Sequence, residues 1–155
     1  MPIRFADVGQ NIYDFGDVFW VQCPRCQWRA RVAAVSSANE KAPGWLFGPR
    51  RLTCKHCSLS KDCAGNGFGI GRQPEDWYFG LSLWLQTPCC GQVLWAYNER
   101  HLAFLEQYVG ATLRETTLEA GNRSLASRLP RWIKSGQHRE EVLAGLRRLR
   151  ALLEE

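Results

Sequence analysis

Two pairs of cysteines, each pair separated by two residues, constrain this chain more than any other feature. The first pair lies in a Cys-Pro-Arg-Cys sequence and the second in a Cys-Lys-His-Cys sequence. Two thiolates at this spacing can chelate one metal ion from a single tight turn, and a second such turn completes a tetrahedron. We therefore expect one structural zinc ion, because four thiolates leave no open position for water or substrate. Its predicted ligands are Cys23, Cys26, Cys54 and Cys57.

The alternative interpretation of these motifs is a redox disulfide. Thioredoxin-like motifs of this spacing lie near a βαβ arrangement, which the flanking sequence does not predict. The chain has seven cysteines, and an odd number argues against a full set of disulfides. Its first residues lack a basic stretch followed by an apolar one, so no secretory signal is expected. These observations favour metal binding in the cytoplasm.

The sequence around the cysteine pairs predicts short strands. Residues 17–22 are β-branched and aromatic, and residues 28–32 alternate large apolar with basic side chains. Residues 36–44 are predicted to form a loop, and residues 45–53 lead into the second pair. Strands that alternate with two tight cysteine turns have the layout of a zinc ribbon. The glycine-rich residues 65–71 are expected to be a flexible loop, because the lysine and the helix of a phosphate-binding loop are missing.

A long apolar segment precedes the helical part of the chain. Residues 77–98 contain no charged side chain and are long enough to cross a membrane. Polar residues and a proline interrupt the centre of this segment, where a membrane helix needs continuity. A buried, Trp-rich antiparallel β-hairpin within residues 76–98 is therefore expected, and no membrane. If Thr87 pairs with Gln92, Trp84 lies opposite Trp95.

Cys89 and Cys90 lie at the turn of this predicted hairpin. Their Thr-Pro-Cys-Cys-Gly sequence is similar to a cysteine knuckle that lacks its first ligand. The simplest expectation is that both are small buried side chains. A second metal would need a further half-site from Cys63 with His56 or His101, and the sequence leaves that alternative open.

The rest of the chain is predicted to be helical. Apolar residues recur at spacings of three and four from Leu102 to Leu113, and a second stripe runs from Val142 to Leu153. Amphipathic helices of this length must pack on the β region or on a partner. The predicted fold is α+β, with the Zn(Cys)4 ribbon and the hairpin in residues 1–98. A helical segment, residues 99–155, is expected to pack on that region as one compact unit.

Positive charge is concentrated near the C-terminus. Residues 121–150 carry eight basic and two acidic side chains, a net charge of +6, whereas the whole chain carries +5. This favours nucleic acid or an acidic protein surface as a partner, although a solvated helix face is the plainer explanation. Trp132 could stack on an unpaired base or anchor the core. The candidate contact residues are Arg128, Arg131, Trp132, Lys134, Arg139, Arg147 and Arg148.

A Cys-Pro-x-Cys pair followed by a Cys-x-x-Cys pair resembles the zinc ribbon named after transcription factor IIB. Residues 79–91, 94–98 and 124–132 extend the resemblance to a group of bacterial zinc-ribbon-containing proteins, over most of the chain from Val21 onward. The resemblance implies zinc binding and a bacterial source, and it implies no particular activity. Gln27 and Ser58 depart from it, because ribbons commonly have glycine after each pair. The two knuckle turns are therefore candidates for distortion.

No catalytic signature accompanies the three histidines or the remaining cysteines, so we expect that the protein is not an enzyme. The leading hypothesis is a non-enzymatic zinc-binding protein that binds nucleic acid in a regulatory role. The alternative is a protein-interaction module, such as an immunity or antitoxin protein that masks a partner. Arg25, Lys55 and His56 lie inside the cysteine pairs, where they can offset the charge of a Zn(Cys)4 centre or contact phosphates.

Overall fold

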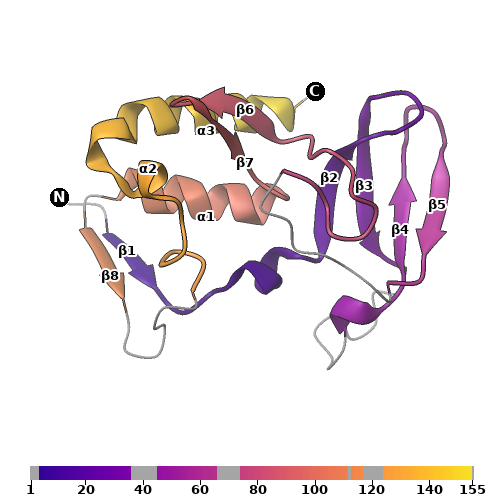
Figure 1. The fold of residues 1–155 in the computed structure, drawn as a ribbon, viewed down its shortest axis with the longest axis horizontal. Helices are drawn as coiled ribbons and strands as arrows, with labels where there is room; N and C mark the ends of the chain where they lie inside the picture. The colour runs from indigo at the N-terminus through magenta and orange to yellow at the C-terminus, as the bar shows by residue number, and fades with distance from the viewer. Residues whose placement is uncertain (1–3, 36–44, 66–73, 112, 117–123, 155) are drawn as a thin grey trace. The chain divides into compact units, whose positions relative to one another are not determined.

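The computed structural model describes residues 4–35, 45–65, 74–111, 113–116 and 124–154 (Figure 1). The chain divides into two compact units. The sheet unit consists of Gly16–Gln86 and Trp95–Asn98, and the helical unit consists of Met1–Phe15, Thr87–Leu94 and Glu99–Glu155. Helices combined with an antiparallel sheet confirm the mixed fold class. The predicted boundary at residue 98 stays a prediction, and the predicted loops at 36–44 and 66–71 lie outside the described residues.

The sheet unit is built on four antiparallel strands in the order β2-β3-β4-β5. Their bounds are β2 Val18–Gln22, β3 Arg29–Ala34, β4 Arg50–Thr53 and β5 Ser60–Cys63, and a short 3-10 helix, η2, occupies Trp45–Phe47. One cysteine pair lies in the turn between β2 and β3, and the other lies in the turn between β4 and β5. The strands predicted around the two pairs are therefore present, and they form one sheet.

Alternation of side chains gives this sheet one buried and one solvent-facing side. The buried side carries Phe19, Val21, Ala30, Val32 and Leu52, each at most 2% exposed. Each large apolar side chain buried in this way stabilises the fold by about 1.5–3 kcal/mol. A slip of one residue would turn this apolar set to solvent, so its burial fixes the register. The register then brings Trp20, Arg31 and Thr53 into line on the opposite side.

An aromatic cluster covers the buried side of the sheet. The ring of Phe19 lies 5.0 Å from the rings of both Trp77 and Tyr97, measured between centroids. The indole N–H of Trp77 donates a 3.0 Å hydrogen bond to the Tyr97 hydroxyl, which satisfies the polar ends of both buried side chains. A Cβ at Gly16 would lie 2.2 Å from the Trp77 ring, so this close approach requires glycine.

A hairpin forms in this segment, but it is shorter than predicted and in a different register. Its strands are mostly exposed or half-buried and include Trp95 but not Trp84, so the expected buried, Trp-rich hairpin is not confirmed. Strands β6 (Gln86–Cys89) and β7 (Gln92–Trp95) form a two-stranded sheet. Cys90 and Gly91 have φ angles of 55° and 72°, as the two central residues of a type I′ turn require. The Ala96 N–H donates to the Leu85 carbonyl, which shifts the pairing by two residues from the predicted Thr87–Gln92 match. Trp84 therefore precedes β6, and its predicted pairing with Trp95 across the ladder is wrong.

No helix among the described residues is long and apolar enough to span a membrane. The apolar segment at residues 77–98 instead contributes β6, β7 and isolated bridges.

The helical unit contains two longer helices, α1 (Glu99–Gly110) and α3 (Arg139–Leu152). Shorter elements are η1 (Ile12–Phe15), α2 (Arg131–Lys134) and η3 (Gly136–His138), and strands β1 (Arg4–Asp7) and β8 (Leu113–Thr116) pair in parallel. The predicted apolar stripes are buried and lie on the faces where α1 and α3 pack together. They comprise Leu102, Leu105 and Val109 on α1 and Val142, Leu146 and Leu149 on α3.

The first helix was predicted too long. Its apolar stripe was expected to continue to Leu113, but α1 ends at Gly110 and Leu113 begins strand β8. The guanidinium of Arg139 donates a 2.6 Å hydrogen bond to the Gly110 carbonyl, one of the carbonyls that a helix end leaves without an intrahelical partner. A contact distant in sequence therefore stabilises the helix end, which the local pattern of apolar residues does not encode.

Candidate metal centre and basic pocket

The two cysteine turns have the same backbone geometry. The N–H of Gln27 donates to the Cys23 carbonyl, and the N–H of Ser58 donates to the Cys54 carbonyl, both at 2.9 Å. Gln27 and Ser58 have φ angles of 65° and 66°, in the left-handed region that favours glycine. The knuckle turns are therefore not distorted by these two departures from glycine. The strain falls on the backbone of the two residues instead.

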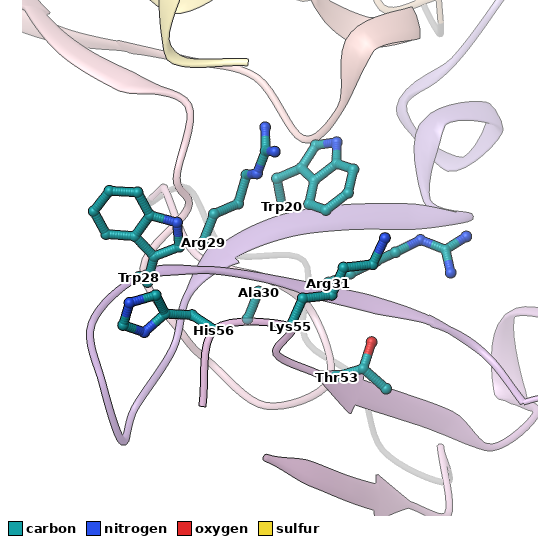
Figure 2. A pocket seen from close by; sticks show the side chains of 8 residues that line it. All are labelled: Trp20, Trp28, Arg29, Ala30, Arg31, Thr53, Lys55 and His56. Carbon is teal, nitrogen blue, oxygen red and sulfur yellow. The ribbon is translucent and has the colours of Figure 1, made fainter. Parts of the chain in front are cut away.

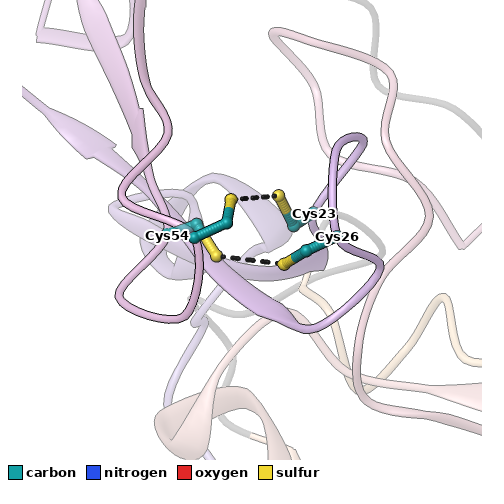
Figure 3. Close-up of side chains that lie close together, drawn as sticks. Cys23, Cys26 and Cys54 are labelled. Atoms are coloured by element: carbon teal, nitrogen blue, oxygen red, sulfur yellow. Dashed lines mark hydrogen bonds between the residues drawn. The ribbon is translucent and has the colours of Figure 1, made fainter.

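The four thiols converge on one point (Figure 3). Their sulfur atoms all lie within 4.8 Å of one another. The Cys23 and Cys57 sulfurs are 3.6 Å apart, and the Cys26 and Cys54 sulfurs are 3.5 Å apart. A tetrahedron with zinc–sulfur bonds of about 2.3 Å has sulfur–sulfur edges of about 3.8 Å. The cluster can therefore hold one metal ion, and four thiolates in this arrangement suit zinc.

The thiols differ in how readily they lose a proton. Burial raises the pKa of Cys23, but hydrogen bonds from the backbone N–H groups of Cys26 and Arg25 outweigh it and lower that pKa to about 6. Burial and the neighbouring thiols raise the pKa of Cys26 to about 12. One thiolate therefore forms readily, and negative charge on it opposes the next. A divalent cation removes this repulsion, so metal binding and release of the remaining protons are coupled.

The solvent-facing side of the sheet forms a pocket of about 480 Å³ (Figure 2). It is lined by Trp20, Trp28, Arg29, Ala30, Arg31, Thr53, Lys55 and His56. The ring of Trp28 is stacked on His56, with centroids 5.4 Å apart and planes 26° apart. The guanidinium of Arg29 lies 4.9 Å from the centre of the Trp20 ring, a cation–π contact. The pocket thus combines indole rings with cations, and it has no acidic residue in its lining.

The sheet region is as positive as the C-terminal region. Residues 18–63 carry eight basic and two acidic side chains, a net charge of +6. One of the acids, Asp62, forms a bidentate pair with Arg51 at 2.7 and 3.0 Å, and this pair lowers the pKa of Asp62. A Zn(Cys)4 centre carries a charge of −2, which would leave the region clearly positive. Positive charge is therefore not confined to the C-terminal region, because the region around the cysteine cluster carries the same net charge.

The predicted contact residues of the C-terminal region fall into two groups. Some make hydrogen bonds within the helical unit: Lys134 to the Ser127 carbonyl, Arg139 to Gly110, and Arg148 to the Thr87 hydroxyl and the Pro88 carbonyl. By exposure, Arg128, Arg131 and Arg147 lie at the surface and Trp132 is half-buried. Arg131 and Arg147 make no side-chain hydrogen bond or ion pair within the part of the chain that the structure describes. All seven stay predictions as partner contacts.

The other cysteines do not join the cluster. Among the described residues, the four predicted ligands are the one group of three or more such side chains that lie close enough to hold a metal. Cys89 is buried, as expected, and its sulfur lies 3.7 Å from that of Cys90. The thiol of Cys90 lies 3.3 Å from the Glu141 carboxylate. Burial, this carboxylate and Cys89 raise the pKa of Cys90 to about 12, so it is a poor nucleophile.

The pocket is not predicted from the sequence, because residues 28–32 show only the alternation of a strand. Their alternation of apolar and basic side chains places Arg29 and Arg31 on the same side of β3. Trp20 joins them because β2 pairs with β3 in a register that the buried residues fix. The sequence signal that could have indicated this pocket is a strand with basic and aromatic side chains next to a metal-binding turn.

Comparisons with known proteins return no match, whether the chain is scanned against protein-family models or compared with curated proteins or with solved structures.

Proposed function

We propose that the protein is a non-enzymatic zinc protein, that its sheet unit is a zinc ribbon, and that it binds nucleic acid in a regulatory role. The observation that carries the proposal is the pocket on the solvent-facing side of β2, β3 and β4. Arg29, Arg31 and Lys55 supply positive charge there, and the residues that line the pocket include no acidic side chain. Phosphate groups supply the complementary charge. The reducing cytoplasm is the compartment in which seven unpaired cysteines persist.

Zinc has a structural role in this proposal. Cys23 directly follows β2 and Cys54 directly follows β4, so the metal connects the ends of strands that are not adjacent in the sheet. The pocket contains residues from β2, β3, β4 and the second cysteine turn. Loss of the metal would separate these elements, and nucleic-acid binding is therefore expected to depend on zinc.

The basic residues of the helical unit are a second candidate surface for phosphates. Arg128, Arg131 and Arg147 are exposed. Hydrogen bonds of Lys134, Arg139 and Arg148 hold those three side chains against their own unit. We therefore place the principal contact on the sheet and a supporting contact on the three exposed arginines.

A salt titration with two charge-reversal variants tests the proposal. Zinc-loaded protein is titrated into fluorescently labelled DNA and RNA oligonucleotides at several salt concentrations, with anisotropy as the readout. Each lost phosphate contact should reduce the slope of log K against log[salt] by about 1. We expect a double variant, Arg31→Glu with Lys55→Glu, to weaken binding more than Arg128→Glu with Arg131→Glu.

Three outcomes would count against this assignment in different ways. A larger effect of the helical variant would move the principal contact to the helical unit. Equal affinity of the wild type and both variants would contradict a phosphate-binding surface. No binding by the wild type at low salt would favour the alternative, a protein-interaction module such as an immunity or antitoxin protein that presents its arginines to an acidic partner surface.

A further inference from the structure

The pocket contains a partly exposed indole ring in addition to its charge. Trp28 is 44% exposed, which is unusual for a large indole ring. Its ring is stacked on His56 and lies 5.8 Å from the ring of Trp84, measured between centroids. These contacts fix the plane of the indole before any ligand arrives. A ring that is already fixed loses little conformational entropy when a second flat group stacks on it.

The other indole in the pocket is arranged differently. Trp20 has the guanidinium of Arg29 4.9 Å from its ring centre, so this cation already occupies one aromatic face. Arg31 lies directly opposite Trp20 on the neighbouring strand and is exposed. Figure 2 shows Trp28 and His56 together on one side of the pocket, while Arg31 and Lys55 extend from the strand and the turn toward the other side, where Trp20 lies. The pocket therefore combines a stacked aromatic pair on one side with cations on the other side that can reach a phosphate.

We propose that this pocket is a stacking site for an unpaired base, and that the protein binds single-stranded nucleic acid in preference to duplex. The inference rests on the proposed nucleic-acid function and assigns its substrate class. An aromatic platform beside a basic groove is the combination that binds single strands without reading their sequence. Trp28 is the stacking residue, and Arg31 and Lys55 contact backbone phosphates of the same strand.

Two physical considerations favour a single strand over a duplex. A base inside a duplex is covered on both faces by its neighbours, so it reaches a protein ring only after it is unstacked and flipped out. A single strand requires no such step. The volume of about 480 Å³ also lies in the range of about 300–1,000 Å³ that is usual for pockets that bind small organic groups, and a nucleotide is such a group.

Competition between single strands and duplex tests the inference. The probes are a labelled oligothymidylate, an oligouridylate of the same length, and a blunt DNA duplex of that length. We expect the wild type to bind both single strands more tightly than the duplex. Trp28→Ala should weaken single-strand binding by about 5- to 150-fold, the range found for loss of one stacked base, and should weaken duplex binding much less.

Matched variants separate stacking from folding. Trp28→Phe keeps an aromatic ring and should retain most of the affinity, whereas Trp132→Ala removes the other tryptophan predicted to stack and should have little effect. Each variant must retain zinc and a cooperative thermal transition, which shows that the sheet unit is folded. If Trp28→Phe binds as poorly as Trp28→Ala while it retains zinc, stacking at this position is refuted.

The outcomes distinguish this inference from the proposed function. Equal affinity for single strands and duplex, with no effect of Trp28→Ala, would overturn the stacking site and leave phosphate binding standing. A loss with Trp132→Ala alone would place the stacking residue in the helical unit and also overturn the inference. If the wild type binds none of the three probes at low salt, the proposed function fails, and the inference fails with it.

Discussion

Glycine at the two strained turn positions should stabilise the protein. Gln27 and Ser58 adopt the left-handed conformation, which costs an L-residue about 1–2 kcal/mol. Glycine avoids this cost but loses about 0.5–1 kcal/mol more backbone entropy on folding. The expected net gain is about 0.5–1 kcal/mol for Gln27→Gly and a similar amount for Ser58→Gly. For a chain of this length, that gain corresponds to a rise of about 1–4 °C in Tm.

The side chains of Gln27 and Ser58 make no contribution that would offset the expected gain in stability. No side-chain hydrogen bond or ion pair of Gln27 or Ser58 is present within the described residues, and both side chains are exposed. The hydrogen bonds that their backbone N–H groups donate to Cys23 and Cys54 remain available to glycine. The substitution therefore changes the backbone cost and leaves the turn itself intact.

The assay is chemical denaturation of zinc-saturated protein, compared with alanine at the same positions. Gln27→Ala removes the same side chain but keeps Cβ, so it should be less stable than Gln27→Gly. Arg25 in the same turn does not have a positive φ, and there the order should reverse, with Arg25→Ala more stable than Arg25→Gly. If alanine is the more stable replacement at residues 27 and 58 as well, the account of strain in these turns is refuted.

Two further predictions concern the helical unit. A Cβ at Gly145 would lie 2.8 Å from a Leu94 methyl, so Gly145→Ala should lower the free energy of unfolding by about 1–3 kcal/mol; Gly110→Ala meets nothing within 4 Å and should be neutral or stabilising in the same denaturation experiment. Burial lowers the pKa of His101 to about 3, so its imidazole should stay neutral in NMR spectra down to pH 4.5. In the unfolded state the His101 imidazole binds a proton near pH 6.5, so this group lowers the stability of the fold as pH falls from about 6.5 toward 3. A charged His101 imidazole at pH 5 in the folded protein would contradict its burial.

Local sequence patterns predicted the metal cluster well and the outer side of the sheet poorly. The spacing within Cys23–Cys26 and Cys54–Cys57 fixes two chelating turns, and ligand chemistry requires them to meet. The apolar stripes of α1 and α3 were predicted equally well, because helical periodicity is a local property of the sequence. The features that the sequence did not predict depend on contacts between residues distant in sequence. The end of α1 is held by Arg139, and the alignment of Trp20 with Arg31 follows from strand register.

The hairpin shows a different reason for failure. The assumed pairing of Thr87 with Gln92 implies a longer turn, and a cysteine is uncommon at a position that requires positive φ. The structure places Cys90 there, with φ 55°, and the ladder consequently continues through Cys89. A two-residue change in turn length moved every cross-strand partner, including both tryptophans. The type of turn sets the register of a hairpin, and the identities of the turn residues did not predict the type of turn here.

The metal content of the purified protein tests the central claim most directly. Elemental analysis combined with native mass spectrometry should give one zinc ion per chain. Cys57→Ser should lose the metal and the cooperative transition of the sheet unit, whereas Cys63→Ser, a cysteine of β5 outside the cluster, should keep both. Protein that folds without metal, or that retains its zinc after Cys57→Ser, would contradict a zinc centre that holds the sheet together.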